Sequence, residues 1–479
     1  MLLQCFPGLK SSKFICLLNR FFYSKYYIFL VGLLTLLCNI FGFEIYYYYF
    51  LAIAFIATPV LLCDDLLPIV VPFSMTYSSV SLKSNNASGG SSIVGGNNTF
   101  HLIFIASLVI FALIARIVFN LVCNRKMFVK PKLLLGYCFL APCYLLGGIF
   151  TKYYQTNTVL YGLVNFCSIS LLYFVLLFSI NWKQTKADYF FHIMTTYGLV
   201  LVFEVLYIYI KYKSGDNSFI SVTGHLFTGW GMRNNIAGQI SLCVAAPLFL
   251  SIRKIKLTPL YIFLSCCMVV ACLLVGSRSG FVASLLFMFA GIIVLLVKCK
   301  DQRTILGSCL FVLIIISVGA LITFEDEVSV LFARFIDEGL SVSSTPRPST
   351  WLQGILHFIE NPLFGVGFYQ CKYFIFYNFS TGFVPPRYHD IYVQFLASTG
   401  LFGLVAYFYH RYETLIITFK KPTLEKTFIY FTVAALVITS FVDNHFFNMG
   451  PGLNYCVALA FIEGQNIKES IFDSEPTTA

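Results

Sequence analysis

Four short groups of residues contain the arginines and the histidine that could do chemistry in this chain. They are Trp230-Gly-Met-Arg233-Asn-Asn235, Gly276-Ser-Arg278-Ser-Gly280, Arg347 ahead of Trp351, and Arg387 with His389. An arginine guanidinium stays charged, and its fork of donors matches the oxygens of a diphosphate. A histidine can accept a proton from an attacking hydroxyl near neutral pH. Together these residue types suit the transfer of a group from a diphosphate to a hydroxyl.

This chemistry assigns a role to each candidate. The candidate ligands of a donor diphosphate are Arg278, Arg347, Arg233 and Arg387. His389 is the candidate general base, and Asp390 beside it would orient the imidazole or an acceptor. Each assignment has a structural alternative, because a lone arginine can reach lipid headgroups as an interfacial anchor and a histidine can simply be solvated there. No Cys/His spacing typical of a metal site is present in the sequence.

The composition places these residues in a membrane protein. The chain has 479 residues, of which 58% are hydrophobic and only 11% are charged. A soluble domain carries about 25% charged residues. The net charge of +11 fits a membrane protein, in which the excess of Lys and Arg usually lies in the cytoplasmic loops. The sequence has no basic patch interleaved with aromatic residues outside the membrane, which would have suggested a nucleic-acid site. We therefore predict an all-α polytopic membrane protein with no nucleic-acid partner.

Apolar runs and basic clusters give a topology. A helix needs about 20 apolar residues to cross a bilayer, and the chain offers about 12–14 such stretches, including 45–73, 158–181, 236–252, 258–275, 280–297, 391–409 and 427–445. Clusters at 183–186, 253–256 and 298–303 are separated by two spans each, so all can face the cytoplasm. The polar stretch 324–390 then faces outward. The topology of residues 1–99 stays open, since Asp64-Asp65 interrupts one run.

This topology divides the chain into four parts. We expect residues 1–323 to form an N-terminal bundle of about ten spans, and 324–390 to form one large outer loop that carries short helices. Residues 391–463 form the C-terminal membrane helices, and 464–479 a cytoplasmic tail. Inside the loop, Pro348 and Asn361-Pro362 bound an amphipathic helix over 349–360, whose apolar face could lie on the membrane or pack on the bundle.

Two motifs in this region resemble the O-antigen ligase and polymerase family of bacterial inner-membrane proteins. Arg347-Pro-Ser-Thr-Trp351 followed by Glu360-Asn-Pro-Leu-Phe-Gly-Val-Gly367 resembles the large periplasmic loop of that family. His389-Asp390, nine residues, Gly400, two residues and Gly403 resembles the ligase signature, which has Asn, Ser or Gln where this chain has Asp390. Arg278 resembles an arginine that the family presents at the periplasmic face. These motifs cover about residues 230–410.

The resemblance implies a glycosyltransferase in the bacterial inner membrane that needs no cofactor. Its donor would be an undecaprenyl-diphosphate-linked oligosaccharide. A ligase moves the glycan to lipid A-core, a polymerase moves it to another lipid-linked repeat unit, and a third relative moves it to protein serine; the sequence does not choose between them. Membrane lipids and a chain-length regulator are further candidate partners. The competing hypothesis is a transporter such as a lipid-linked oligosaccharide flippase, which would need neither the long outer loop nor His389.

Overall fold

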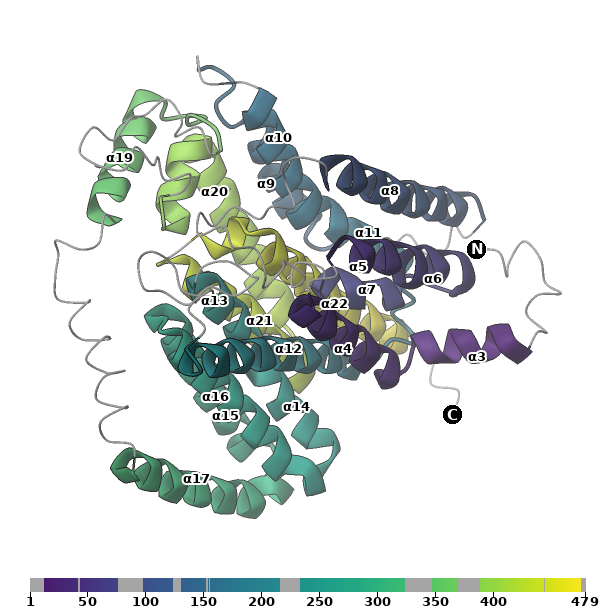
Figure 1. Cartoon of the computed structure of the whole chain (residues 1–479). Coiled ribbons are helices and arrows are strands. Elements are labelled where there is room, and N and C mark those ends of the chain that lie inside the picture. The colour runs from purple at the N-terminus through teal and green to yellow at the C-terminus, as the bar shows by residue number, and fades with distance from the viewer. Residues whose placement is uncertain are drawn as a thin grey trace. The chain divides into compact units, whose positions relative to one another are not determined.

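The computed structural model describes residues 13–41, 44–75, 98–123, 131–151, 154, 156–215, 233–323, 347–368, 388–442 and 444–474. All regular structure within these ranges is helical, as predicted (Figure 1). Five helices in the described residues are long and apolar enough to cross a membrane, or six if the bent pair Lys13–Phe22 and Lys25–Phe41 counts as one span. The chain is thus a multi-pass membrane protein.

Two stretches that the sequence predicts as full spans contain only shorter apolar helices in the described residues, Tyr48–Leu62 and Leu134–Leu146. The run 45–73 breaks after α6 (Thr58–Leu62), at the Asp64-Asp65 pair. There the Asp65 carboxylate accepts hydrogen bonds from the Tyr23 hydroxyl (2.7 Å) and from the backbone N–H of Leu67 (3.0 Å) and Asn181 (2.9 Å). A buried carboxylate needs such partners, so the aspartate fixes a turn within the apolar run.

The chain forms two compact units. The first comprises residues 1–129, 175–324 and 464–479, and the second comprises residues 130–174 and 325–463. The longer helices of the first unit are α4 (Lys25–Phe41), α8 (Asn98–Cys123), α12 (Ala187–Lys213), α13 (Arg233–Cys243), α14 (Ala245–Arg253), α15 (Thr258–Val275), α16 (Arg278–Lys298) and α17 (Arg303–Thr323). The second holds α9 (Leu134–Leu146), α10 (Thr156–Asn165), α19 (Arg347–Glu360), α20 (Ile391–Phe419), α21 (Leu424–Ser440) and most of α22 (Met449–Ser474). The four-part division by membrane side remains a prediction.

In the first unit α13, α15 and α16 pack closely, as their side-by-side ribbons show (Figure 1). Cys272, near the end of α15, donates to the Ala237 carbonyl near the start of α13 (3.6 Å) and contacts the Ser284 hydroxyl of α16 (3.3 Å). Further along, Ser265 donates to the Val244 carbonyl (2.9 Å). α15 is therefore antiparallel to both neighbours, and α13 and α16 begin at the same end of this unit.

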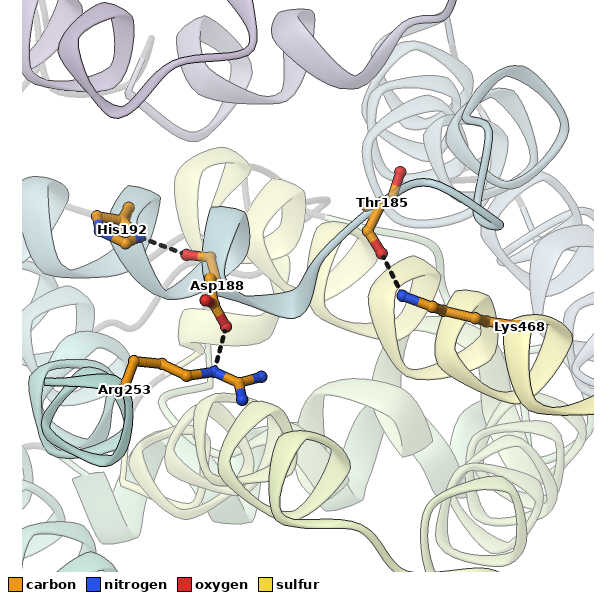
Figure 2. A network of polar contacts seen from close by, with 5 residues as sticks. All are labelled: Thr185, Asp188, His192, Arg253 and Lys468. Carbon is orange, nitrogen blue, oxygen red and sulfur yellow. Dashed lines mark hydrogen bonds and ion pairs between the residues drawn. The ribbon is translucent and has the colours of Figure 1, made fainter. Parts of the chain in front are cut away.

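Basic residues gather at the opposite end of the first unit. Figure 2 shows Arg253, the last residue of α14, bonded to Asp188 in the first turn of α12 (3.0 Å), and Lys468 donating to the Thr185 carbonyl (3.2 Å). The Gln302 side chain donates to the Ser251 carbonyl (2.9 Å), which brings the 298–303 cluster to the same end. An exposed ion pair adds little stability. These contacts nevertheless place the basic clusters 183–186, 253–256 and 298–303 at one end of the unit, as expected if all three face the same side of the membrane.

The second unit is organised around a break inside α20. Gly400 has φ +67° and ψ −163°, which interrupts the helix, and the segment 362–367 packs against the interruption. Backbone hydrogen bonds run from the N–H of Val366 to Ala397 O (2.7 Å), Gly367 to Ser398 O (2.9 Å), Leu401 to Pro362 O (2.8 Å) and Phe402 to Leu363 O (3.2 Å). The break thus exchanges helical bonds for bonds to the loop, so that the groups freed by the kink stay paired.

Gly400→Ala is expected to lower the free energy of unfolding by about 1–3 kcal/mol, since a side chain in this conformation is strained and its Cβ would overlap the Leu363 carbonyl. Gly365, at φ +64°, faces the backbone of Ala397 to Thr399 and should behave alike. Thermal unfolding in detergent measures the change. The control is Gly307→Ala in α17, where an added methyl meets nothing within 4 Å; equal effects at Gly400 and Gly307 would contradict this account of the kink.

Candidate functional site

Two of the predicted diphosphate ligands begin neighbouring helices of the first unit. Arg233 is the first residue of α13 and Arg278 the first residue of α16. The two first turns touch, because Gly280 lies so close to Ala237 that a Cβ on the glycine would overlap it. Backbone N–H groups at a helix N-terminus point outward without helical partners and favour anions. Two helix N-termini and two arginine positions therefore meet at the end of this unit opposite the basic clusters.

Ser277 occupies the position before α16 without capping that helix. Its backbone is extended (φ −97°, ψ 113°), as for a capping residue, but its side chain makes no bond to the first turn of α16. A serine at this position usually accepts from the N–H two or three residues on. Gly276 before it is left-handed at φ +74° and closes α15. The Ser277 side chain therefore does not accept from the first N–H groups of α16. These groups lie at the start of the helix, beside the half-buried Arg278.

In the second unit, His389 has an unusual backbone conformation. Its φ is +55°, and among the described residues it is the one non-glycine residue with a positive φ. A non-glycine residue in the left-handed region costs about 1–3 kcal/mol and persists only where its surroundings hold it; such residues gather at active sites. The half-buried His389 lies directly before α20. The candidate base thus stands at a strained position in the fold.

Asp390 caps α20. Its Oδ1 accepts the backbone N–H of Tyr392 (2.8 Å) and of Val393 (2.9 Å). Burial raises the pKa of the Asp390 carboxyl, and these two hydrogen bonds oppose that shift. Asp, Asn and Ser are nearly equivalent as helix caps. The cap explains why an aspartate can stand where the ligase signature has Asn or Ser, and the predicted orienting role of Asp390 stays a prediction.

Tyr388, on the other side of His389, bonds to α19 and to α20. Its hydroxyl lies 2.5 Å from Nδ1 of His357, and its N–H donates to Oε1 of Gln394 (3.3 Å). Gln394 also accepts from Nδ2 of Asn444 (2.5 Å). Tyr388 and His357 are both almost fully buried. Neither His357 nor Tyr388 is among the residues predicted from the sequence, although His357 falls on the small and polar face of the predicted amphipathic helix.

The orientation of α19 answers one question that the sequence left open. Its buried positions are Thr350, Gly354 and His357, which form its small and polar face, and Gly354 lies against Tyr388 and Val393 of the α20 region. The large apolar residues are exposed instead: Trp351, Leu352, Ile355, Leu356 and Ile359. The apolar face of α19 therefore does not pack on α20, and the hypothesis that it lies on the membrane fits better.

The remaining candidates are less well placed. Arg347 is the first residue of α19, in the same unit as His389 and Asp390, and its side chain lies outside the described set. Arg387 lies outside the described residues altogether. The structure thus brings the starts of the helices that carry Arg233 and Arg278 together in one unit, and places His389 and Asp390 with Tyr388 and His357 in the other.

Residues 260–408 match the O-antigen ligase family. This stretch extends from within α15 to within α20 and includes Arg278, Arg347, His389 and Asp390. The resemblance seen in the sequence motifs is confirmed. No curated protein matches the chain.

Proposed function

We propose that this protein transfers an undecaprenyl-diphosphate-linked glycan to an acceptor hydroxyl at the periplasmic face of the bacterial inner membrane. The proposal rests chiefly on one observation: the stretch that matches the O-antigen ligase family contains both Arg278, at the start of a helix, and His389, in a strained conformation before another. Arg278 is suited to bind an anion, and His389 is suited to act as a positioned base. The acceptor is the hydroxyl of a lipid-linked glycan or of lipid A-core.

The chemistry of the donor decides what the protein must supply. The acceptor oxygen attacks the anomeric carbon, the bond from that carbon to the diphosphate oxygen breaks, and undecaprenyl diphosphate leaves. In this proposal Arg278, Arg233, Arg347 and Arg387 bind the diphosphate and neutralise its developing charge. His389 takes the proton of the acceptor hydroxyl. Attack opposite the leaving group inverts the anomeric centre, and no metal or nucleotide sugar is needed.

The fate of lipid-linked repeat units in a strain lacking the protein tests this function. A missing transferase leaves the units on the outer leaflet, complete and unprocessed. A missing flippase would leave them on the inner leaflet. Digestion of the exposed glycan by an added glycosidase in intact spheroplasts distinguishes the two cases. Units that resist digestion in the deletion strain but not in a wild-type control would contradict the proposal.

The proposal also requires 324–390 to be periplasmic and the chain from Gln465 to be cytoplasmic. We expect a cysteine introduced at position 340 or 380 to react with an impermeant maleimide in intact spheroplasts, and one introduced at the exposed Ser470 to react only after lysis. The background is a variant without its sixteen native cysteines. Protection of positions 340 and 380 in intact cells would place His389 on the wrong side of the membrane for this function.

A further inference from the structure

The neighbours of His389 must hold it in its left-handed conformation, because this conformation is strained for a residue with a side chain. A chain segment free at one end would leave the left-handed region, at a gain of about 1–3 kcal/mol. The residues on both sides of His389 are fixed by named hydrogen bonds. Releasing either side would let the backbone turn, and the imidazole would turn with it.

On the far side, Asp390 is fixed as the cap of α20 through the N–H groups of Tyr392 and Val393. Its backbone is extended, at φ −156° and ψ 131°. On the near side, Tyr388 is only 3% exposed and bonds through both its N–H and its hydroxyl. His389 therefore bridges two anchored residues whose positions determine its φ.

The hydroxyl anchor of Tyr388 is His357, in the last turn of α19. The second ring nitrogen of His357, Nε2, lies 2.8 Å from Nε2 of Gln353, one turn earlier on the same helix. Burial lowers the pKa of His357 to about 4, so the ring is neutral at physiological pH. A neutral imidazole has one donor and one acceptor nitrogen. The amide nitrogen of Gln353 donates to Nε2, so Nδ1 carries the proton and donates to the Tyr388 hydroxyl. The ring is thus held from two sides without a charge.

We propose that His357 is a positioning residue of the transfer reaction, which holds His389 in its left-handed conformation through the Tyr388 hydroxyl. The inference rests on the proposed function, in which His389 is the general base. His357 touches neither substrate nor reacting atoms in this account. It links the loop helix α19 to the residue directly before the base, so that the base is aimed only while α19 is docked on α20.

The test is glycan transfer by the purified full-length protein from an undecaprenyl-diphosphate-linked glycan, with donor retention measured on the same samples. Tyr388→Phe and His357→Leu each remove the hydrogen bond at similar side-chain volume. We expect each to lower kcat about 10- to 100-fold, since a small misplacement of a catalytic group costs about that much. The KM for the donor and the fraction of protein that retains it should not change. His357→Asn should keep most of the activity, because its amide can replace Nδ1.

Two controls make the test specific. Tyr392→Phe removes a hydroxyl from a residue whose ring stacks on Phe408 (5.4 Å) and should leave kcat unchanged. The double variant of Tyr388→Phe with His357→Leu should be no slower than either single variant, since both break one interaction. Additive losses, loss of donor retention in His357→Leu, or failure of His357→Asn to restore activity would each overturn the positioning role.

The two hypotheses fail differently. If His357→Leu and Tyr388→Phe transfer glycan at the wild-type rate while His389→Ala is inactive, the positioning role is wrong and the base role stands. If His389→Ala itself transfers at the wild-type rate, the proposed function of His389 is wrong, and the positioning role falls with it.

Discussion

Replacing His389 by alanine is expected to lower glycan transfer by about 10²–10⁴-fold, which is the usual worth of a general base. The variant should still insert in the membrane and accumulate. It should also still retain the lipid-linked donor, because in the proposed mechanism arginines bind the diphosphate. The measurement is transfer from purified donor, with donor retention on the same protein. Alanine keeps the Cβ of histidine and therefore the same backbone restriction, which glycine would remove. Any loss of transfer in His389→Ala therefore reports mainly on the missing imidazole.

His192→Ala is the matched control for this experiment. That histidine lies in α12 with Nδ1 2.7 Å from the Asp188 carbonyl, beside the basic end of the first unit (Figure 2). The His192→Ala substitution should leave glycan transfer unchanged. Wild-type transfer by His389→Ala would remove the base role, and lost donor retention in a folded variant would move His389 to the diphosphate site instead. Asp390→Asn should be mild, since asparagine caps a helix as well as aspartate does.

Replacing Arg278 by alanine is expected to weaken donor binding by about 10- to 150-fold, which corresponds to the roughly 1.5–3 kcal/mol of a hydrogen bond to a charged group. Arg278→Lys should restore binding only in part, because an ammonium cannot hold two phosphate oxygens in one plane. Arg347→Ala is expected to act in the same direction. Equilibrium binding of the lipid-linked donor to the protein in nanodiscs gives the dissociation constant.

Arg253→Ala controls for the loss of a positive charge. Arg253 ends α14 at the opposite end of the first unit and bonds to Asp188. Its removal should leave donor binding within about twofold, because charges farther apart than about 10 Å are largely screened in salt. Equal weakening by Arg253→Ala and Arg278→Ala would show a general charge effect, and unchanged binding in Arg278→Ala would make that residue an interfacial anchor only.

Composition and hydrophobic runs were enough to predict a helical membrane protein, and proline and asparagine were enough to place a helix at 349–360, where α19 spans Arg347–Glu360. The internal breaks were harder to predict. Gly365 is typical of a sharp turn and Gly400 of close packing, but the sequence does not show that α20 opens at Gly400 and bonds to residues 362–367. Such a break depends on partners about 35 residues apart in the chain, which local periodicity cannot reveal.

The same limit applies to the candidate site. His389 and Arg278 could be chosen from residue type and from their place at the ends of apolar runs. His357 could not, because its value lies in a contact with Tyr388, 31 residues away. The predicted role of Asp390, to orient the imidazole or an acceptor, rests on its place beside His389, and the structure adds a cap, in which Oδ1 accepts from the first N–H groups of α20. Helix-cap propensity was the signal that could have predicted this cap.

The most direct test of the central claim uses the purified protein in liposomes with an undecaprenyl-diphosphate-linked glycan and, in parallel, a lipid-linked glycan or lipid A-core as acceptor. The account predicts a glycan joined to one of these acceptors through an inverted anomeric centre, with one undecaprenyl diphosphate released for each glycan transferred and no requirement for a metal. Donor that crosses the bilayer without being consumed, and with no new glycosidic bond, would show a transporter and contradict the account.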